Sequence, residues 1–209
     1  MLQHNIDQIM IGEISGDAQL GIYAVARRIM QALAFIPIVI TQSMAAKITS
    51  SRMKSFREYF KNLEYLYRSL FLIFLAIAIP LIILSDKIIY VFFGSQYAGA
   101  GILLSLMTIR FLFTSFGVIR GQFITNEGIF KHSLLTSSVG IGLNVVLNLL
   151  LIPVYGPIGA IIATIISFII VIFAIDIFLE KTRSNAMLML SAIFNMRKNY
   201  IFFRNILRG

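Results

Sequence analysis

The longest uncharged stretch of this chain runs from Ser133 to Ile175, which is 43 residues without an Asp, Glu, Lys or Arg. It is interrupted in its middle by Pro153-Val154-Tyr155-Gly156-Pro157, a segment that we expect to end one helix before the next begins. A helix crosses the roughly 30 Å hydrocarbon core of a bilayer with about 20 apolar residues, because it rises about 1.5 Å per residue. The stretch is therefore long enough for two crossings, and it predicts a transmembrane hairpin.

The composition agrees with a membrane protein. Hydrophobic residues make up 58% of the chain, the mean hydropathy is +0.88, and 13% of the residues are charged, against roughly 25% in an ordinary globular domain. The 209 residues suffice for one membrane domain. The absence of cysteine excludes disulfides, thiol chemistry and Cys-based metal sites.

Hydropathy and helix breakers predict an all-α integral membrane bundle with five complete transmembrane helices and a truncated first one. The short first helix covers about residues 1–14, and the complete spans cover about 20–46, 66–84, 101–125, 133–153 and 158–179. Residues 1–180 thus form a transmembrane lobe. Residues 181–209 are expected to form a basic tail at the cytoplasmic interface.

The net charge of +9 is explained by topology rather than by nucleic acid. Three segments that fall on one side of the membrane hold 13 of the 18 basic residues: Lys47, Arg52, Lys54, Arg57, Lys61 and Arg68; Lys131; and Lys181, Arg183, Arg197, Lys198, Arg204 and Arg208. By the positive-inside rule we expect this side and the carboxy terminus to be cytoplasmic. The basic loop from Lys47 to Arg68 also carries aromatic residues, and we expect it to lie on anionic lipid headgroups.

Three arginines lie inside predicted spans and are candidates for substrate binding. Arg27 and Arg28 fall about eight residues into a span, and Arg110 falls about ten residues into another, near the middle of the bilayer. A charge at that depth costs at least about 2.5–3.5 kcal/mol, so it normally faces a wet cavity or a partner. Asp7, in the first helix, is a candidate ion-pair or ion-coupling residue.

Polar and small residues form the helix face that carries Arg110. Thr114, Gly117 and Gly121 follow Arg110 at helical spacing, as expected for a cavity wall. Arg120, near the cytoplasmic end of the same span, is expected to snorkel towards the headgroups.

Two amides lie one turn apart in the span expected at about residues 133–153. Asn144 and Asn148 share a face with Gly140. They either hold helices together, because buried amides bond across helix interfaces, or they line a cavity and contact a substrate. The sequence leaves both interpretations open.

No set of residues indicates catalysis, so we expect a protein that is not an enzyme and needs no cofactor or metal. His4 and His132 have no partner at ligand spacing. Asp176, near the end of the last span, is expected at the interface.

Three stretches resemble the polysaccharide flippases of the multidrug/oligosaccharidyl-lipid/polysaccharide exporter superfamily. They are Asp7-Gln8-Ile9-Met10-Ile11-Gly12 with Leu20-Gly21-Ile22-Tyr23-Ala24-Val25-Ala26-Arg27-Arg28-Ile29; Phe93-Gly94-Ser95-Gln96-Tyr97-Ala98-Gly99-Ala100; and residues 144–160, which include Pro153 and Pro157. The resemblance implies the carboxy-terminal lobe of a two-lobe, twelve-helix transporter. It also implies a cationic cavity through which undecaprenyl-pyrophosphate-linked oligosaccharide is translocated for O-antigen or capsule synthesis.

The partners implied are membrane lipids, the lipid-linked oligosaccharide and an opposing lobe, supplied by a missing amino-terminal half or a second copy. One alternative is a drug/cation antiporter of the same superfamily, which favours carboxylates in its spans. Another is a non-transporting membrane remnant or scaffold.

Overall fold

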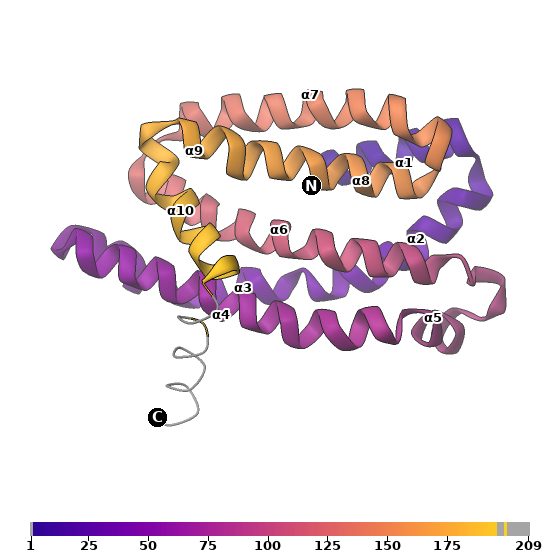
Figure 1. Ribbon diagram of the computed structural model, residues 1–209, viewed down its shortest axis with the longest axis horizontal. Coiled ribbons are helices and arrows are strands. Elements are labelled where there is room, and N and C mark those ends of the chain that lie inside the picture. Colours follow the sequence, from indigo (N-terminus) through magenta and orange to yellow (C-terminus); the bar gives the residue numbers. More distant parts are fainter. Residues whose placement is uncertain (1, 196–198, 200–209) are drawn as a thin grey trace.

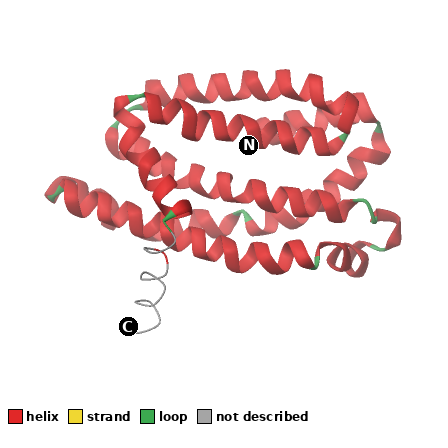
Figure 2. Cartoon of the chain, in the orientation of Figure 1, coloured by secondary structure: helices red, strands yellow, loops and turns green. Residues whose placement is uncertain are grey.

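The computed structural model describes residues 2–195 and residue 199, and all regular elements of this part are helices. The long helices run side by side in a bundle (Figures 1 and 2). Five helical segments are long and apolar enough to cross a membrane: Asp17–Lys54, Phe56–Ile83, Ala100–Glu127, Phe130–Tyr155 and Pro157–Phe178. The predicted all-α membrane bundle with five spans is confirmed. The first helix, α1 (Leu2–Ser15), has 14 residues.

The first complete span is built from two helices. α2 (Asp17–Leu33) and α3 (Phe35–Lys54) meet at Ala34. Pro37 has no N–H, so the carbonyl of Leu33 lacks the donor that a continuous helix would supply four residues later. The break therefore follows directly from the position of the proline.

The basic segment between the first two complete spans is helical rather than a loop. α3 continues to Lys54, the backbone is extended at Ser55 with φ −158° and ψ 124°, and α4 (Phe56–Ile83) begins at once. The guanidinium of Arg52 binds the carboxylate of Glu127 at the end of another helix, with Nε 2.7 Å from Oε1. It also lies 4.2 Å from the centre of the Phe56 ring. These contacts fix the end of the α3–α4 hairpin.

After α4 the chain turns through α5 (Ser85–Phe93) and the short helix η1 (Ser95–Tyr97) into α6 (Ala100–Glu127). α6 is the central helix, because it packs against α2, α3, α4 and α8. Large aromatic side chains fill its contact with α4: Tyr59 stacks on Phe123 with ring centroids 6.5 Å apart, and Tyr67 meets Phe116 edge-on at 5.2 Å.

The hairpin predicted from the uncharged stretch is present, with a tighter turn than expected. α7 (Phe130–Tyr155) continues through Pro153, and a single residue separates it from α8 (Pro157–Phe168). Gly156 alone makes the turn, with φ 56° and ψ −138°, a conformation that L residues with a side chain rarely adopt. Pro157 suits the first helical position because its missing N–H would have no partner there.

The last span ends in a π-helical segment, η2 (Ile169–Ile175), followed by α9 (Asp176–Phe178). Asp176 is fully buried instead of interfacial. Its carboxylate accepts two hydrogen bonds from Arg120, with Nε at 2.6 Å and Nη2 at 2.9 Å, and Arg120 also binds Thr136 at 3.1 Å. The expectations of an interfacial Asp176 and a snorkelling Arg120 were wrong, because the two charges satisfy one another inside the bundle.

The start of the expected tail is a packed helix. α10 (Glu180–Phe194) lies against α4 and buries Thr182, Asn185 and Met189. The hydroxyl of Tyr67 donates to Asn185 at 3.0 Å, and Arg68 donates to Ser191 at 2.8 Å and to Asn199. The basic residues Arg197, Lys198, Arg204 and Arg208 lie outside the described residues.

The close contact between α7 and α8 gives a first prediction. A Cβ on Gly159 would overlap the backbone carbonyl of Leu151, which cannot move aside easily. We expect Gly159→Ala to destabilise the protein by about 1–3 kcal/mol, the usual cost of overpacking, measured by thermal unfolding in detergent. Gly142→Ala is the matched control, because a Cβ there meets no atom within 4 Å. Equal stability of the two variants would contradict the packing described.

Candidate functional site

A buried polar cluster joins α1, α7 and α8. The carboxylate of Asp7, which is fully buried, accepts hydrogen bonds from the Asn148 amide at 2.8 Å and from the Thr164 hydroxyl at 3.1 Å. Asn144 donates to Thr164 at 3.2 Å, and Asn148 donates to Asn144 at 3.4 Å. Both asparagines are fully buried. The bonds to Asp7 and Thr164 join α7 to α1 and α8, and the bond between the two asparagines lies within α7.

Arg110 approaches this cluster from α6. Its Nη1 lies 3.7 Å from Oδ2 of Asp7, and its side chain is 6% exposed. The distance makes an ion pair but is too long for a hydrogen bond. Among the described residues no acceptor lies within hydrogen-bonding distance of Nη1. The attraction of the Asp7 carboxylate therefore holds the Arg110 guanidinium in place, and its Nη1 donates no hydrogen bond to a described residue.

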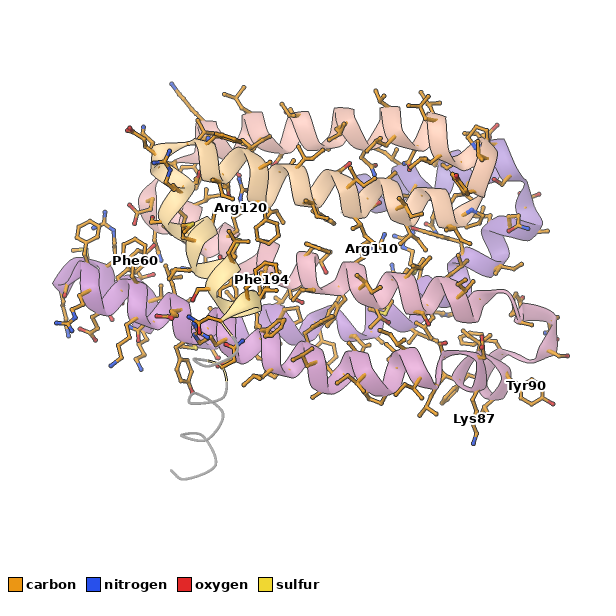
Figure 3. All side chains as sticks on the ribbon, viewed as in Figure 1. Phe60, Lys87, Tyr90, Arg110, Arg120 and Phe194 are labelled. Atoms are coloured by element: carbon orange, nitrogen blue, oxygen red, sulfur yellow. The ribbon has the colours of Figure 1, made fainter. Side chains whose placement is uncertain are left out.

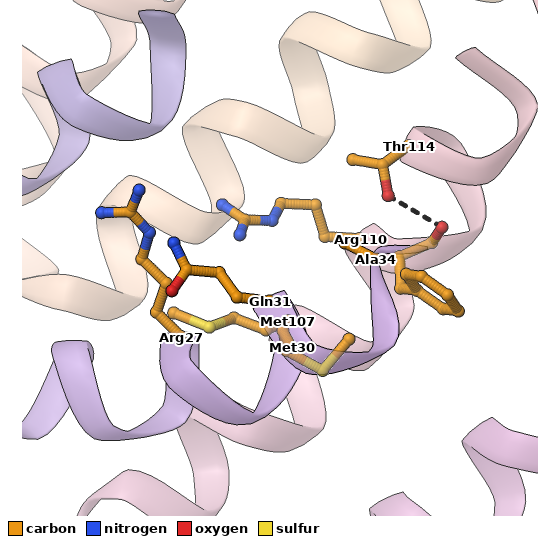
Figure 4. A pocket seen from close by; sticks show the side chains of 8 residues that line it. Arg27, Met30, Gln31, Ala34, Met107, Arg110 and Thr114 are labelled. Carbon is orange, nitrogen blue, oxygen red and sulfur yellow. Dashed lines mark hydrogen bonds between the residues drawn. The ribbon is translucent and has the colours of Figure 1, made fainter. Parts of the chain in front are cut away.

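The other side of Arg110 opens on a hollow between α2 and α6 (Figure 4). The hollow has a volume of about 110 Å³ and is lined by Arg27, Met30, Gln31, Ala34, Met107, Arg110, Phe111 and Thr114. The break at Ala34 sets the end of α2 that carries Arg27 and Gln31. Two guanidinium groups thus line one small cavity, and no carboxylate is among its lining residues.

The structure separates the candidate arginines. Arg27 and Arg110 line the hollow, whereas Arg28 is exposed on another side of α2, because adjacent helical residues point about 100° apart. Figure 3 shows Arg110 and Arg120 in the space between α6 and α8. Of the stripe predicted on α6, Thr114 joins the hollow, and a Cβ on Gly117 would touch Ile172 of η2 at 3.9 Å.

Two residues of this region were not singled out in the sequence. Thr164 is a hydroxyl in a strongly apolar span, a type of residue that most often bonds to its own helix, and its Oγ1 does donate to the Ala160 carbonyl at 3.0 Å. Gln31 follows Arg27 by four residues, so it shares the same face. That spacing was a usable signal.

The two buried arginines of α6 differ in how well they are satisfied. Arg120 makes three hydrogen bonds of 2.6–3.1 Å to Asp176 and Thr136. Arg110 has one ion pair at 3.7 Å. A buried charge normally needs hydrogen bonds as well as a counter-charge. Hydrogen bonds thus satisfy Arg120 inside the bundle, whereas Nη1 of Arg110 has no hydrogen-bond acceptor among the described residues.

His132 does not belong to this region. Its Nε2 lies 3.4 Å from Asp176, the carboxylate that Arg120 binds. The side chain of His4 lies outside the described residues. Within the described part of the chain, no group of three His, Asp or Glu residues is placed to hold a metal ion.

The fold and the site define a multi-pass helical membrane protein with a cationic hollow inside its bundle. Residues 1–101 match the family model described as "Polysaccharide biosynthesis protein". No curated protein and no solved structure matches the chain.

The pairing of Asp7 with Arg110 gives a second prediction. Asp7→Asn and Arg110→Gln each leave a buried charge unpaired, which typically costs about 3–5 kcal/mol. The double variant removes both charges, so we expect it to cost less than the sum of the single variants, with a coupling of about 0.5–3 kcal/mol. The measurement is a double-mutant cycle by thermal unfolding in detergent.

Arg28→Gln serves as the control for this cycle. It removes the same charge at an exposed position, so its effect should stay within about 0.5 kcal/mol. Additive losses from the Asp7 and Arg110 variants would contradict an ion pair between them.

Proposed function

We propose that this chain is a component of a flippase that translocates undecaprenyl-pyrophosphate-linked oligosaccharide across the bacterial inner membrane for surface polysaccharide synthesis. The observation that carries the proposal is the hollow lined by Arg27 and Arg110 without a carboxylate. Guanidinium groups suit a pyrophosphate because they bind its oxygens in pairs. The family match over residues 1–101 supports the link to polysaccharide.

In this proposal Arg110 and Arg27 attract the pyrophosphate, and Gln31 and Thr114 bind polar groups beside it. Asp7 holds Arg110 in the absence of substrate, since the two side chains are 3.7 Å apart. Binding of an anion by Arg110 would compete with Asp7 for the guanidinium. Asp7 is the ionisable residue of the α1–α7–α8 cluster, so its protonation state would affect how readily Arg110 binds the substrate.

The hollow is small and open on one side, so transport requires an opposing helical bundle across it. The proposal assigns this role to a second lobe, supplied by another polypeptide segment or by a second copy. Such transporters alternate access by rocking one bundle against the other.

The end of the bundle that carries the α3–α4 hairpin, the α6–α7 connection and α10 is proposed to be cytoplasmic (Figure 1). The support is its charge, because the basic residues of the α3–α4 hairpin, Lys131 and the basic residues of α10 gather there.

The test is restoration of surface polysaccharide in a flippase-deficient strain by the full transporter rebuilt with its opposing lobe. We expect Arg110→Gln and Arg27→Gln each to reduce the surface polysaccharide at least tenfold, as expected for loss of a charge-assisted contact worth roughly 1.5–3 kcal/mol. Arg28→Gln is the matched control and should keep most of the activity.

Because Arg110→Gln leaves Asp7 unpaired, the Asp7→Asn/Arg110→Gln double variant is tested at equal membrane level. It restores the charge balance of the core but should stay inactive. Normal polysaccharide from this double variant and from Arg27→Gln would refute the proposal. Raised resistance to cationic dyes on expression would instead favour a drug/cation antiporter.

A further inference from the structure

The exposed face of α4 changes chemistry along its length. At spacings of three or four residues, exposed or half-buried positions follow one another on this face: Arg57, Lys61, Tyr65, Ser69, Leu72, Ala76, Ile79 and Ile83. The part from Leu72 onward is apolar. Tyr65, 46% exposed, comes next, and the two cations lie beyond it towards the start of the helix. This order matches the succession of hydrocarbon core, interface and headgroups on one side of a bilayer.

The distances along the helix fit those layers. From Ile83, Tyr65 lies about 27 Å away, Lys61 about 33 Å and Arg57 about 39 Å at a rise of 1.5 Å per residue. The hydrocarbon core is about 30 Å thick and the bilayer with its headgroups about 40–45 Å. With Ile83 at one edge of the core, Tyr65 reaches the other edge, where tyrosine is enriched. Lys61 and Arg57 then lie among the headgroups.

Contacts with other helices hold the two cations at this depth. Tyr59, between them in sequence, stacks on Phe123 of α6, and Arg52 at the hairpin end binds Glu127 at 2.7 Å. Among the described residues, no carboxylate forms an ion pair with Arg57 or Lys61, and Glu64 binds Arg68 at 2.9 Å. Both cations are exposed on a stretch of helix that these contacts anchor.

We propose that Arg57 and Lys61 bind the phosphate of an anionic glycerophospholipid in the leaflet at this end of the protein, next to Tyr65 at the edge of the hydrocarbon core. The two cations meet the phosphate, and the acyl chains lie along the half of the apolar face nearer to Tyr65, at Leu72 and Ala76. Long basic side chains bury their stems in the interface while the charged ends reach the headgroups. The site is independent of the proposed transport activity.

The chain contains no tryptophan, so a single introduced one reports on its own surroundings. Tyr65→Trp places this probe beside the proposed site in the full chain, reconstituted in phosphatidylcholine vesicles that contain brominated phosphatidylglycerol. Quenching by the bromine atoms, compared with brominated phosphatidylcholine, measures the local preference for the anionic lipid. Tyr90→Trp on the exposed side of α5 is the reference at the other end of the bundle, near Lys87 (Figure 3).

We expect the Tyr65→Trp variant to show an about three- to tenfold preference for phosphatidylglycerol, consistent with two basic side chains near an anionic surface. The preference should fall to the level of the Tyr90→Trp variant when Arg57→Gln and Lys61→Gln are added. Lys87→Gln, which removes an exposed cation at the other end, should leave it unchanged. Increased salt should weaken it by screening.

Equal quenching by the two lipids in the Tyr65→Trp variant, or an unchanged preference after Arg57→Gln and Lys61→Gln are added, would overturn the proposal. Either result would leave these cations to an acidic protein surface instead. Far-ultraviolet circular dichroism of each variant confirms that the helices are retained.

Discussion

A charged side chain inside a membrane protein is stable only where an opposite charge or hydrogen bonds compensate it. In this bundle the compensated charge is that of Arg110, and the contacts that compensate it join several helices. Arg110 lies near the middle of α6, and Asp7 of α1 lies 3.7 Å away. Asp7 in turn is bound by Asn148 of α7 and Thr164 of α8. Four helices are thus fixed around one carboxylate. Without it, Arg110 would be an uncompensated charge in the bilayer, which is strongly unfavourable.

The same helix carries a second buried arginine, Arg120, whose charge is fully compensated by contacts inside the bundle. Arg120 is bound by both oxygens of Asp176 and by Thr136. Arg110 has a weaker hold on its counter-charge and borders a hollow shared with Arg27. The difference in hydrogen bonding, rather than depth or charge, separates the residue that stabilises the bundle from the residue proposed to bind substrate.

Much of this architecture could be predicted from hydropathy. The hairpin of α7 and α8 and the five spans follow from apolar runs. The ion-pair role considered for Asp7 follows from its place in the first helix, beside spans that carry arginine. The pairing of Arg120 with Asp176 could not, because 56 residues separate them and the sequence does not say which helices touch. Arg27 and Arg28 differ only in direction around α2, so packing decides which one faces the hollow.

The central claim is that water and anions reach Arg110 from the hollow between α2 and α6. Because the chain has no cysteine, Thr114→Cys and Gln31→Cys each introduce one reactive thiol at its wall. In membrane vesicles we predict that a membrane-impermeant, negatively charged thiol reagent labels both faster than a positively charged reagent of similar size. Ala76→Cys, on the exposed apolar face of α4, should stay unlabelled. Labelling of Thr114→Cys as slow as that of Ala76→Cys would contradict the account.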